Sequence, residues 1–184
     1  MNKLPINKTQ NQNRLEHVSE QDRNEQAHAA AAKKNGYWGH EGSGCVVFAR
    51  RTGRILIGLR SLEVMEGNTW GTWGGAIDEG FTPKENAHKE LKEETRITEE
   101  PEMIPVFVFE SEAGDFRYHN FIAVVENEFQ PELNWEHDGY NWVEAGHWPL
   151  RMHPGLKILV EQEEFKRLIA DLKTASAPTP TPHS

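Results

Sequence analysis

The chain has 184 residues, of which 36% are hydrophobic and 27% are charged, and its formal net charge is −9. This length suits one sizeable domain and leaves too little chain for a comfortable pair of domains. The negative charge disfavours binding to polyanionic nucleic acid, although cations could still bridge an anionic small molecule to the protein.

The sequence also argues against a membrane-spanning protein and against a disulfide-bonded protein. No apolar run approaches the roughly 18 residues of a membrane span, and the N-terminus lacks the apolar stretch of a signal peptide. Cys45 is the single cysteine, so no intrachain disulfide can form, and we expect a reducing, cytoplasmic compartment. Because Cys45 lies in an apolar run, we interpret it as a small core residue rather than a nucleophile.

Residues 1–36 form a polar N-terminal arm. The first dozen residues are rich in Asn, Gln and Lys, a composition typical of disorder. From about Leu15 to Lys34 the composition favours a helix, with Gly36 as a stop signal. Since this segment has little apolar periodicity, we expect an exposed helix. It could pair subunits or dock on a partner, so the sequence leaves the oligomeric state open.

Residues 37–173 carry the signals of a compact domain. Two β-rich runs, 45–50 and 54–60, flank Arg51-Thr52-Gly53 and indicate a hairpin. Extended segments or strands are also expected at 69–77, 103–111, 116–126 and 140–144. Residues 154–173 place apolar side chains at helical spacing, which predicts a closing amphipathic helix. The remainder, 174–184, alternates Pro with Thr or Ala and is typical of a disordered tail. This order indicates α/β or α+β, with helices covering a sheet.

A helix start is predicted at Thr82-Pro83-Lys84-Glu85. Thr82 can cap the helix, Pro83 suits its first turn, and Glu85 completes a capping box. The helix is expected to run to about Thr95.

Three glutamates share one edge of this helix. At about 100° per residue, Glu90, Glu93 and Glu94 lie beside the apolar face and would repel one another. A solvated acidic face is the plain interpretation. However, Gly74-Gly75 precedes the helix and lets the backbone approach a ligand closely. Since Mg²⁺ prefers carboxylates and phosphate oxygens, the pattern favours a cation site that bridges the acidic protein to a polyphosphate.

Residues 75–97 resemble the Nudix box, G-x5-E-x7-R-E-U-x-E-E-x-G-U, where U is a bulky aliphatic residue. Six of its nine defined positions match, namely Gly75, Glu90, Leu91, Glu93, Glu94 and Ile97. Lys89 stands in for the Arg, whereas Phe81 replaces the first Glu and Arg96 replaces the last Gly. The segments ILIGLRS, NTWGTWGGAI and NWEHDGYNWVEAGHWPL also resemble the family, so the similarity covers about residues 40–173.

The resemblance implies an α/β fold, an α/β/α sandwich with a mixed sheet. It also implies a Mg²⁺-dependent pyrophosphohydrolase, with Mn²⁺ as an alternative. The substrate would be a nucleoside diphosphate derivative or a nucleoside triphosphate, and a metal-activated water would attack phosphorus. The implied metal ligands are Glu90, Glu93, Glu94 and the Gly75 carbonyl.

The resemblance also implies roles for residues around these ligands. Glu93 or Glu94 would orient or deprotonate the water, and Glu136 could act as a further ligand or as the general base. Arg60 is a candidate phosphate contact, and its alternative is a surface charge at a strand end. Lys89 would hold the loop or a carboxylate as a point charge, because it lacks the fork of Arg.

Two departures from the box bear on activity. Phe81 is interpreted as a packing residue before the helix cap, and Asp78 or Glu79 could partly substitute for the missing carboxylate. Arg96 either adopts a positive φ at a cost of about 1 kcal/mol or continues the helix. The alternatives are therefore a weakened Nudix-like nucleotide-binding or regulatory module, and a plain acidic-helix protein.

Other side chains give weaker indications. Several aromatic residues could stack on a base, although each fits the core or its rim better; they are Tyr37, Trp38, Trp70, Trp73 and Tyr118. The histidines from 117 to 153 lack the close paired spacing of a zinc site.

Overall fold

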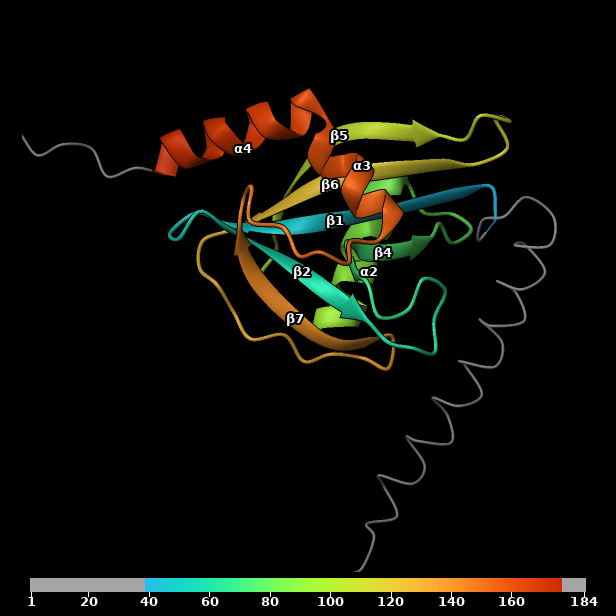
Figure 1. The fold of residues 1–184 in the computed structure, drawn as a ribbon, viewed down its shortest axis with the longest axis horizontal. Coiled ribbons are helices and arrows are strands. Elements are labelled where there is room, and N and C mark those ends of the chain that lie inside the picture. Colours follow the sequence, from blue (N-terminus) through green and yellow to red (C-terminus); the bar gives the residue numbers. More distant parts are fainter. Residues whose placement is uncertain (1–38, 177–184) are drawn as a thin grey trace, which may run out of the picture. The chain divides into compact units, whose positions relative to one another are not determined.

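The structure is a computed structural model that describes residues 39–176, and its centre is one mixed β-sheet (Figure 1). In this range the sheet has seven strands. They are β1 (Glu41–Ala49), β2 (Arg54–Arg60), β3 (Trp70–Gly71), β4 (Trp73–Ala76), β5 (Glu102–Glu110), β6 (Arg117–Val125) and β7 (His137–Glu144). The helices described are α2 (Pro83–Thr95), α3 (Pro154–Glu161) and α4 (Glu163–Ser176).

Strand β1 is the spine of the sheet. It pairs in parallel with β6 along its whole length. On its other side it changes partner, because Gly42 to Cys45 pair with β4, whereas Val47 and Phe48 pair with β2. Strand β2 then pairs antiparallel with β7, and β5 pairs antiparallel with β6. The strands β2 and β4 therefore diverge from a common neighbour.

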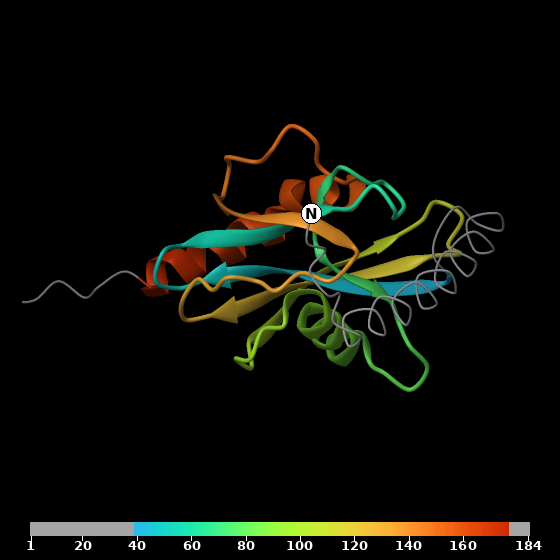
Figure 2. The same ribbon diagram turned by 90° about the horizontal axis from the view of Figure 1, so that it is seen from below.

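Helices cover both faces of the sheet, with α2 on one face and α3 and α4 on the other (Figure 2). Successive side chains of a strand point to opposite faces. Accordingly, Cys45 and Val47 pack in the core beneath α2, whereas Val46 and Phe48 pack in the core beneath α3 and α4. The predicted α/β/α sandwich with a mixed sheet is confirmed. Cys45 is fully buried, as expected of a core residue.

Among the predicted elements, the first hairpin matches the structure, whereas the closing helix differs from it. The hairpin between β1 and β2 is confirmed, and Gly53 adopts the positive φ of 68° that its turn requires. The closing helix, predicted as one segment over 154–173, is two helices. Gln162 between them is extended, with φ −66° and ψ 132°. The second of these, α4, continues to Ser176.

The predicted arm at 1–36 and the last residues of the predicted tail lie outside the described residues. Within residues 39–176, no helix is long and apolar enough to cross a membrane.

Candidate functional site

The start of α2 follows its predicted chemistry. The Thr82 side chain accepts a hydrogen bond from the backbone N–H of Glu85 (3.3 Å), and the Thr82 backbone N–H donates to the Glu85 carboxylate (3.0 Å). Pro83 lies in the first turn, where its missing N–H has no helical partner to lose. The capping box is confirmed, and it fixes where the helix begins relative to the loop before it.

Packing of α2 against the sheet decides which side chains line the site. Ala87 and Leu91 are fully buried and lie one helical turn apart, so they set the rotation of the helix about its axis. Glu94 is buried with them at 1% exposure. The side chain of Glu90 is 15% exposed, whereas that of Glu93 is 52% exposed. The three glutamates therefore share an edge but differ in their contact with water.

Glu94 is a buried carboxylate near the C-terminal end of α2. Among the described residues, neither carboxylate oxygen has a hydrogen-bond partner, although the nearby Gly74 backbone N–H lowers its pKa. Burial raises the pKa of Glu94 well above its usual range, the charges of Glu136 and Glu90 raise it further, and Arg60 opposes them. An unpaired buried acceptor costs about 1–3 kcal/mol, more if it is charged, so a bound cation or donor would stabilise this position.

Glu90 is also shifted by its surroundings. Burial raises its pKa to about 7, and the charges of Glu93 and Glu136 add to this shift, while the charge of Lys89 and its hydrogen bond lower it. The carboxylate lies against Gly75, where an added Cβ would come within 3.1 Å of its Oε2. A glycine at 75 therefore lets the loop backbone lie directly against Glu90.

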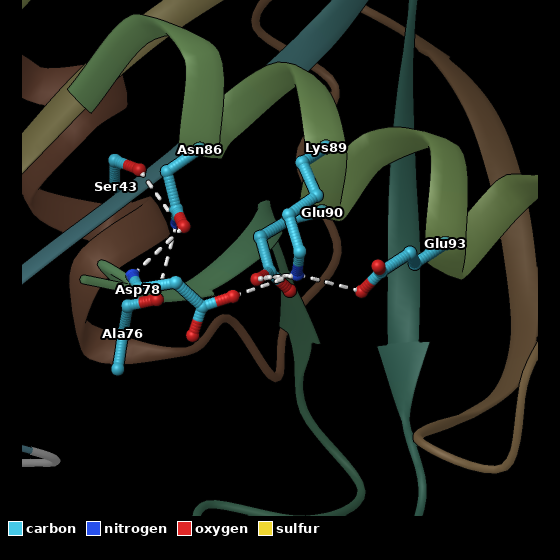
Figure 3. A network of polar contacts seen from close by, with 7 residues as sticks. All are labelled: Ser43, Ala76, Asp78, Asn86, Lys89, Glu90 and Glu93. Carbon is cyan, nitrogen blue, oxygen red and sulfur yellow. Dashed lines mark hydrogen bonds and ion pairs between the residues drawn. The ribbon is translucent and has the colours of Figure 1, made fainter. Parts of the chain in front are cut away.

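Lys89 lies among three carboxylates (Figure 3). Its ammonium is 2.9 Å from Glu93, 3.1 Å from Asp78 and 3.3 Å from Glu90. Burial alone would lower the pKa of Lys89, but its hydrogen bonds to Glu93 and Asp78 and the charge of Glu90 raise it. Lys89 thus holds a loop residue and two of the predicted metal ligands together, as expected of a point charge in place of Arg.

Close contact between β1 and the glycine turn explains the residue at 74. A Cβ at Gly74 would lie 2.3 Å from the Ser43 carbonyl oxygen and 2.4 Å from the Gly44 Cα. Atoms cannot approach so closely, and the backbone of Gly74 also has φ 157°. Only glycine fits here without a shift of β1 or β4.

Arg60 is the last residue of β2 and is only 6% exposed. The interpretation of Arg60 as a surface charge is therefore wrong. Its guanidinium donates to the Met65 carbonyl oxygen from Nε (3.1 Å) and Nη2 (2.9 Å). Burial lowers the pKa of Arg60, and the charges of Glu94 and Glu136 oppose this shift. The structure thus brings Arg60 into the electrostatic reach of the buried carboxylate of Glu94.

Glu136 is distant in sequence from α2, but its charge lies near Glu94 and Arg60. It precedes β7, and its carbonyl oxygen accepts a hydrogen bond from the Ser61 N–H (2.8 Å), directly after β2 ends. Its charge acts on Glu90, Glu94 and Arg60. Glu136, Glu90, Glu94 and Arg60 therefore form one electrostatically coupled group, with Glu93 at its exposed margin.

Burial and backbone conformation decide between the interpretations of three single residues. Phe81 is 43% exposed, so a packing role before the helix cap is wrong. Arg96 is the C-cap of α2 with φ 56° and ψ 27°, so it takes the left-handed conformation instead of continuing the helix. Trp73 is fully buried and donates from its indole to the Leu56 carbonyl oxygen (3.3 Å), which makes it a core residue rather than a base-stacking platform.

Two buried polar residues were missed from the sequence. Asn86 is fully buried and donates to the Ser43 hydroxyl and to the Ala76 carbonyl oxygen, both at 3.1 Å. His137 is 4% exposed, and neither ring nitrogen has a hydrogen-bond partner among the described residues. A polar residue next to Ala87 on the inward face of the helix was the available signal for Asn86.

His137 occupies space that a glycine provides. A Cβ at Gly58 would lie 2.5 Å from the imidazole Cδ2, and the ring centroid lies 4.6 Å from that of Trp73. Burial, with a smaller effect from the Arg60 charge, lowers the pKa of His137 to about 3. The imidazole is therefore neutral near pH 7.

The donor set fits a hard divalent cation. Carboxylate and carbonyl oxygens are the ligands that Mg²⁺ prefers, and Glu94 offers two oxygens that lack partners among the described residues. Within residues 39–176, no three acidic, His or Cys side chains are gathered as a ready-made cluster. Glu93 is instead turned to Lys89. The residues thus fit a cation, but the three helix glutamates are not yet collected around one point.

Comparisons with known proteins give one match in sequence and several in structure. Residues 39–162 match the sequence profile of the NUDIX domain. A search of curated proteins gave no match to the chain.

Solved structures share the fold at low sequence identity. A Nudix hydrolase from M. smegmatis, RenU, has 22% identity and a TM-score of 0.59, covering 77% of this chain and 89% of its own. A MutT NUDIX hydrolase from Burkholderia pseudomallei has 21% identity and a TM-score of 0.55, covering 67% and 97%. An Ap4A hydrolase from C. elegans has 21% identity and a TM-score of 0.51, covering 73% and 96%.

Proposed function

Because the chain belongs to the Nudix family, we propose that it hydrolyses a diphosphate linkage with the help of a divalent cation. The observation that carries this proposal is Glu94, a buried carboxylate near the C-terminal end of α2 whose oxygens lack partners among the described residues and which lies close to Gly74, Glu90 and Glu136. A solvated acidic face would not bury this group.

The proposed metal ligands are Glu90, Glu93, Glu94 and the Gly75 carbonyl. They would hold Mg²⁺, or Mn²⁺ in its place. A cation held by these residues would neutralise charge on phosphate oxygens and would activate a water for attack on phosphorus.

The remaining residues have distinct proposed tasks. Arg60 binds a phosphate oxygen of the substrate, and Lys89 orients Glu93 and the loop. The attacking water loses its proton to a carboxylate, for which Glu94, Glu136 and Glu93 are the candidates. Burial and neighbouring charges raise the pKa of Glu94 in the metal-free protein, and the charge of a bound cation would oppose this shift. No covalent attachment to the protein is needed.

The proposed substrate is a nucleoside diphosphate derivative or a nucleoside triphosphate. Among the proteins that share this fold, one is named as an Ap4A hydrolase and another, from E. coli, as a dihydroneopterin triphosphate pyrophosphohydrolase. Both names describe a polyphosphate joined to an organic group. The net charge of −9 fits such an anion only when cations lie between it and the carboxylates, which agrees with the proposed metal site.

A panel of nucleoside diphosphate derivatives and nucleoside triphosphates, incubated with Mg²⁺ or Mn²⁺, tests the proposal through its phosphate and nucleotide products. The Glu94→Gln variant should lose at least about a hundredfold in rate, because several kcal/mol of charge stabilisation are lost. Glu112→Gln, an exposed carboxylate in the turn between β5 and β6, is the matched control and should keep its activity. Equal rates for the two variants would contradict the proposal.

A nucleotide-binding or regulatory module is the second candidate. It is favoured by the exposed Phe81 where the family pattern has a carboxylate, and by Lys89 pairing with two of the proposed ligands. Tight nucleotide binding without turnover across the panel would support it against the enzyme.

The proposal assigns the chemistry to the domain predicted over residues 37–173 and places the protein in the cytoplasm, in line with its single buried cysteine. Residues 174–176 of the predicted tail are the last turn of α4, whereas the N-terminal arm (1–36), the tail beyond Ser176 and the oligomeric state stay predictions from the sequence.

A further inference from the structure

The loop that leads into α2 is tied to the rest of the domain at two points (Figure 3). The first is Asn86, whose buried amide donates to the Ser43 hydroxyl in β1 and to the Ala76 carbonyl oxygen, both at 3.1 Å. The amide oxygen of Asn86 accepts a hydrogen bond from the Asp78 backbone N–H at 3.1 Å. A single side chain thus joins β1 to both ends of the segment 76–78.

Asn86 acts on the same stretch of backbone as the proposed metal ligands. It lies four residues before Glu90, so both side chains are on one face of α2, one turn apart. Asn86 binds the carbonyl oxygen of Ala76, while Glu90 lies against the neighbouring Gly75. The amide of Asn86 therefore helps to set where the Gly75 backbone lies relative to the Glu90 carboxylate.

The second point is the ion pair between Asp78 and Lys89, at 3.1 Å. Lys89 also contacts Glu90 and Glu93, so Asp78 is the one carboxylate of the three that is not a proposed ligand. An isolated exposed ion pair contributes little, partly because ordering two side chains costs entropy. Here the backbone of Asp78 is already held by Asn86, and Lys89 is already held by two glutamates, so less freedom is lost.

We propose that Asn86 and Asp78 are positioning residues that hold the glycine turn and Lys89 in register with the helix glutamates, so that this chain works with Phe81 in place of a carboxylate. This inference rests on the proposed function, since it assigns these two residues to its cation site. Neither residue touches the reacting atoms.

The expected effect is a loss of cation affinity without loss of the fold. Residues that orient metal ligands typically contribute about 10–100-fold in affinity. We therefore expect Asp78→Asn to weaken Mn²⁺ binding, measured by calorimetry, by about tenfold or more. Its backbone N–H and its exposed position are unchanged, so thermal unfolding should shift little.

The neighbouring residue supplies a matched control. Glu79→Gln removes the same single charge one position along the loop, from an exposed side chain. It should leave Mn²⁺ affinity within about twofold of the wild type. Equal weakening by Asp78→Asn and Glu79→Gln would mean that only long-range charge matters, and unchanged affinity in both would mean that Asp78 positions nothing. Either result overturns the inference.

A second measurement separates this inference from the proposed function. Amide hydrogen exchange over residues 76–81 in metal-free protein should be faster in Asn86→Ala and Asp78→Asn than in the wild type, and unchanged in Glu79→Gln. If the wild type binds no Mn²⁺ at all, the cation site proposed above fails, and so does the role assigned here. If the wild type binds Mn²⁺ but loop exchange is the same in every variant, the positioning role fails while the proposed function stands. Should Asn86→Ala not fold, Asp78→Asn alone decides.

Discussion

Replacing Glu90 with Gln is expected to change how the stability of the metal-free protein depends on pH. Burial raises the pKa of Glu90 from 4.5 to about 7, with the charges of Glu93 and Glu136 adding to the shift and Lys89 opposing it. The unfolded chain keeps a pKa near the ordinary value. Between these two values the folded protein holds a proton that the unfolded chain has released.

The sign of the effect follows from this difference in bound protons. Since the folded state binds more protons, its stability is fully present below about pH 4.5 and is lost as the pH rises to about 7. One pKa unit corresponds to about 1.4 kcal/mol, so Glu90 alone removes about 3 kcal/mol over this window. The side chain is only 15% exposed, and solvent screening therefore leaves most of this effect in place. Glu90→Gln has no charge to bury and lacks this loss.

Urea denaturation from about pH 5 to about pH 8 in the presence of a chelator measures the prediction. The free energy of unfolding of Glu90→Gln should rise relative to that of the wild type with increasing pH, and the difference should level off above about pH 7. Glu112→Gln, an exposed carboxylate, serves as the control and should follow the wild type. Parallel curves for Glu90→Gln and the wild type would show that Glu90 does not titrate in this window and would refute the reasoning from burial.

Three further predictions concern the same helix and its site. Arg96→Gly should raise the free energy of unfolding by about 0.5–1 kcal/mol in thermal denaturation, because Arg96 has φ 56°; an equal gain from Arg96→Ala would contradict this cause. Leu91→Ala should lower it by about 2–5 kcal/mol, because Leu91 is fully buried against the sheet, and a loss below about 1 kcal/mol would mean that α2 is not anchored there. Mg²⁺ at about a hundred times its dissociation constant should stabilise the wild type by about 2.7 kcal/mol, and the gain should vanish in Glu94→Gln. An undiminished gain in that variant would remove Glu94 from the proposed ligands.

Local chemistry made the helix at the site predictable. Thr82, Pro83 and Glu85 form a start signal whose groups lie within a few residues, and the structure has that capping box. The inward face followed from Ala87 and Leu91, because helical spacing alone fixes which residues share a face. The family, predicted from residues 75–97 and their flanks, is confirmed by the match over 39–162.

The other features of the site depend on tertiary contacts, which local sequence patterns do not reveal. The Asn86 amide, on helix α2, binds Ser43 of β1 and Ala76 of β4. No local sequence pattern predicts these contacts. His137 is buried because Gly58, far away in sequence, leaves room for its ring. The burial of Arg60 likewise depends on the loop that brings the Met65 carbonyl oxygen to its guanidinium.

The sequence patterns also did not predict the break in the helix at Gln162 or the exposure of Phe81. Apolar spacing continues through residues 154–173, so periodicity alone predicts one helix, although the backbone of Gln162 is extended. Phe81 was expected to pack because it is hydrophobic. It follows Gly80, a turn residue with φ 89°, and it remains 43% exposed.

The change of partner along β1 implies that one strand will tolerate mutation unequally. In its first half, against β4, an added Cβ at Gly44 would lie 2.6 Å from the Trp73 carbonyl oxygen, so even alanine is excluded without movement. In its second half, against β2, Val47 and Phe48 fill the two cores, where a swap between hydrophobic residues of similar volume usually costs little. A library covering Glu41–Ala49 should therefore recover variants of similar size from the second half and almost none at the glycines of the first. The core positions of β1 can therefore vary, while its glycines, which pack against β4, stay constant.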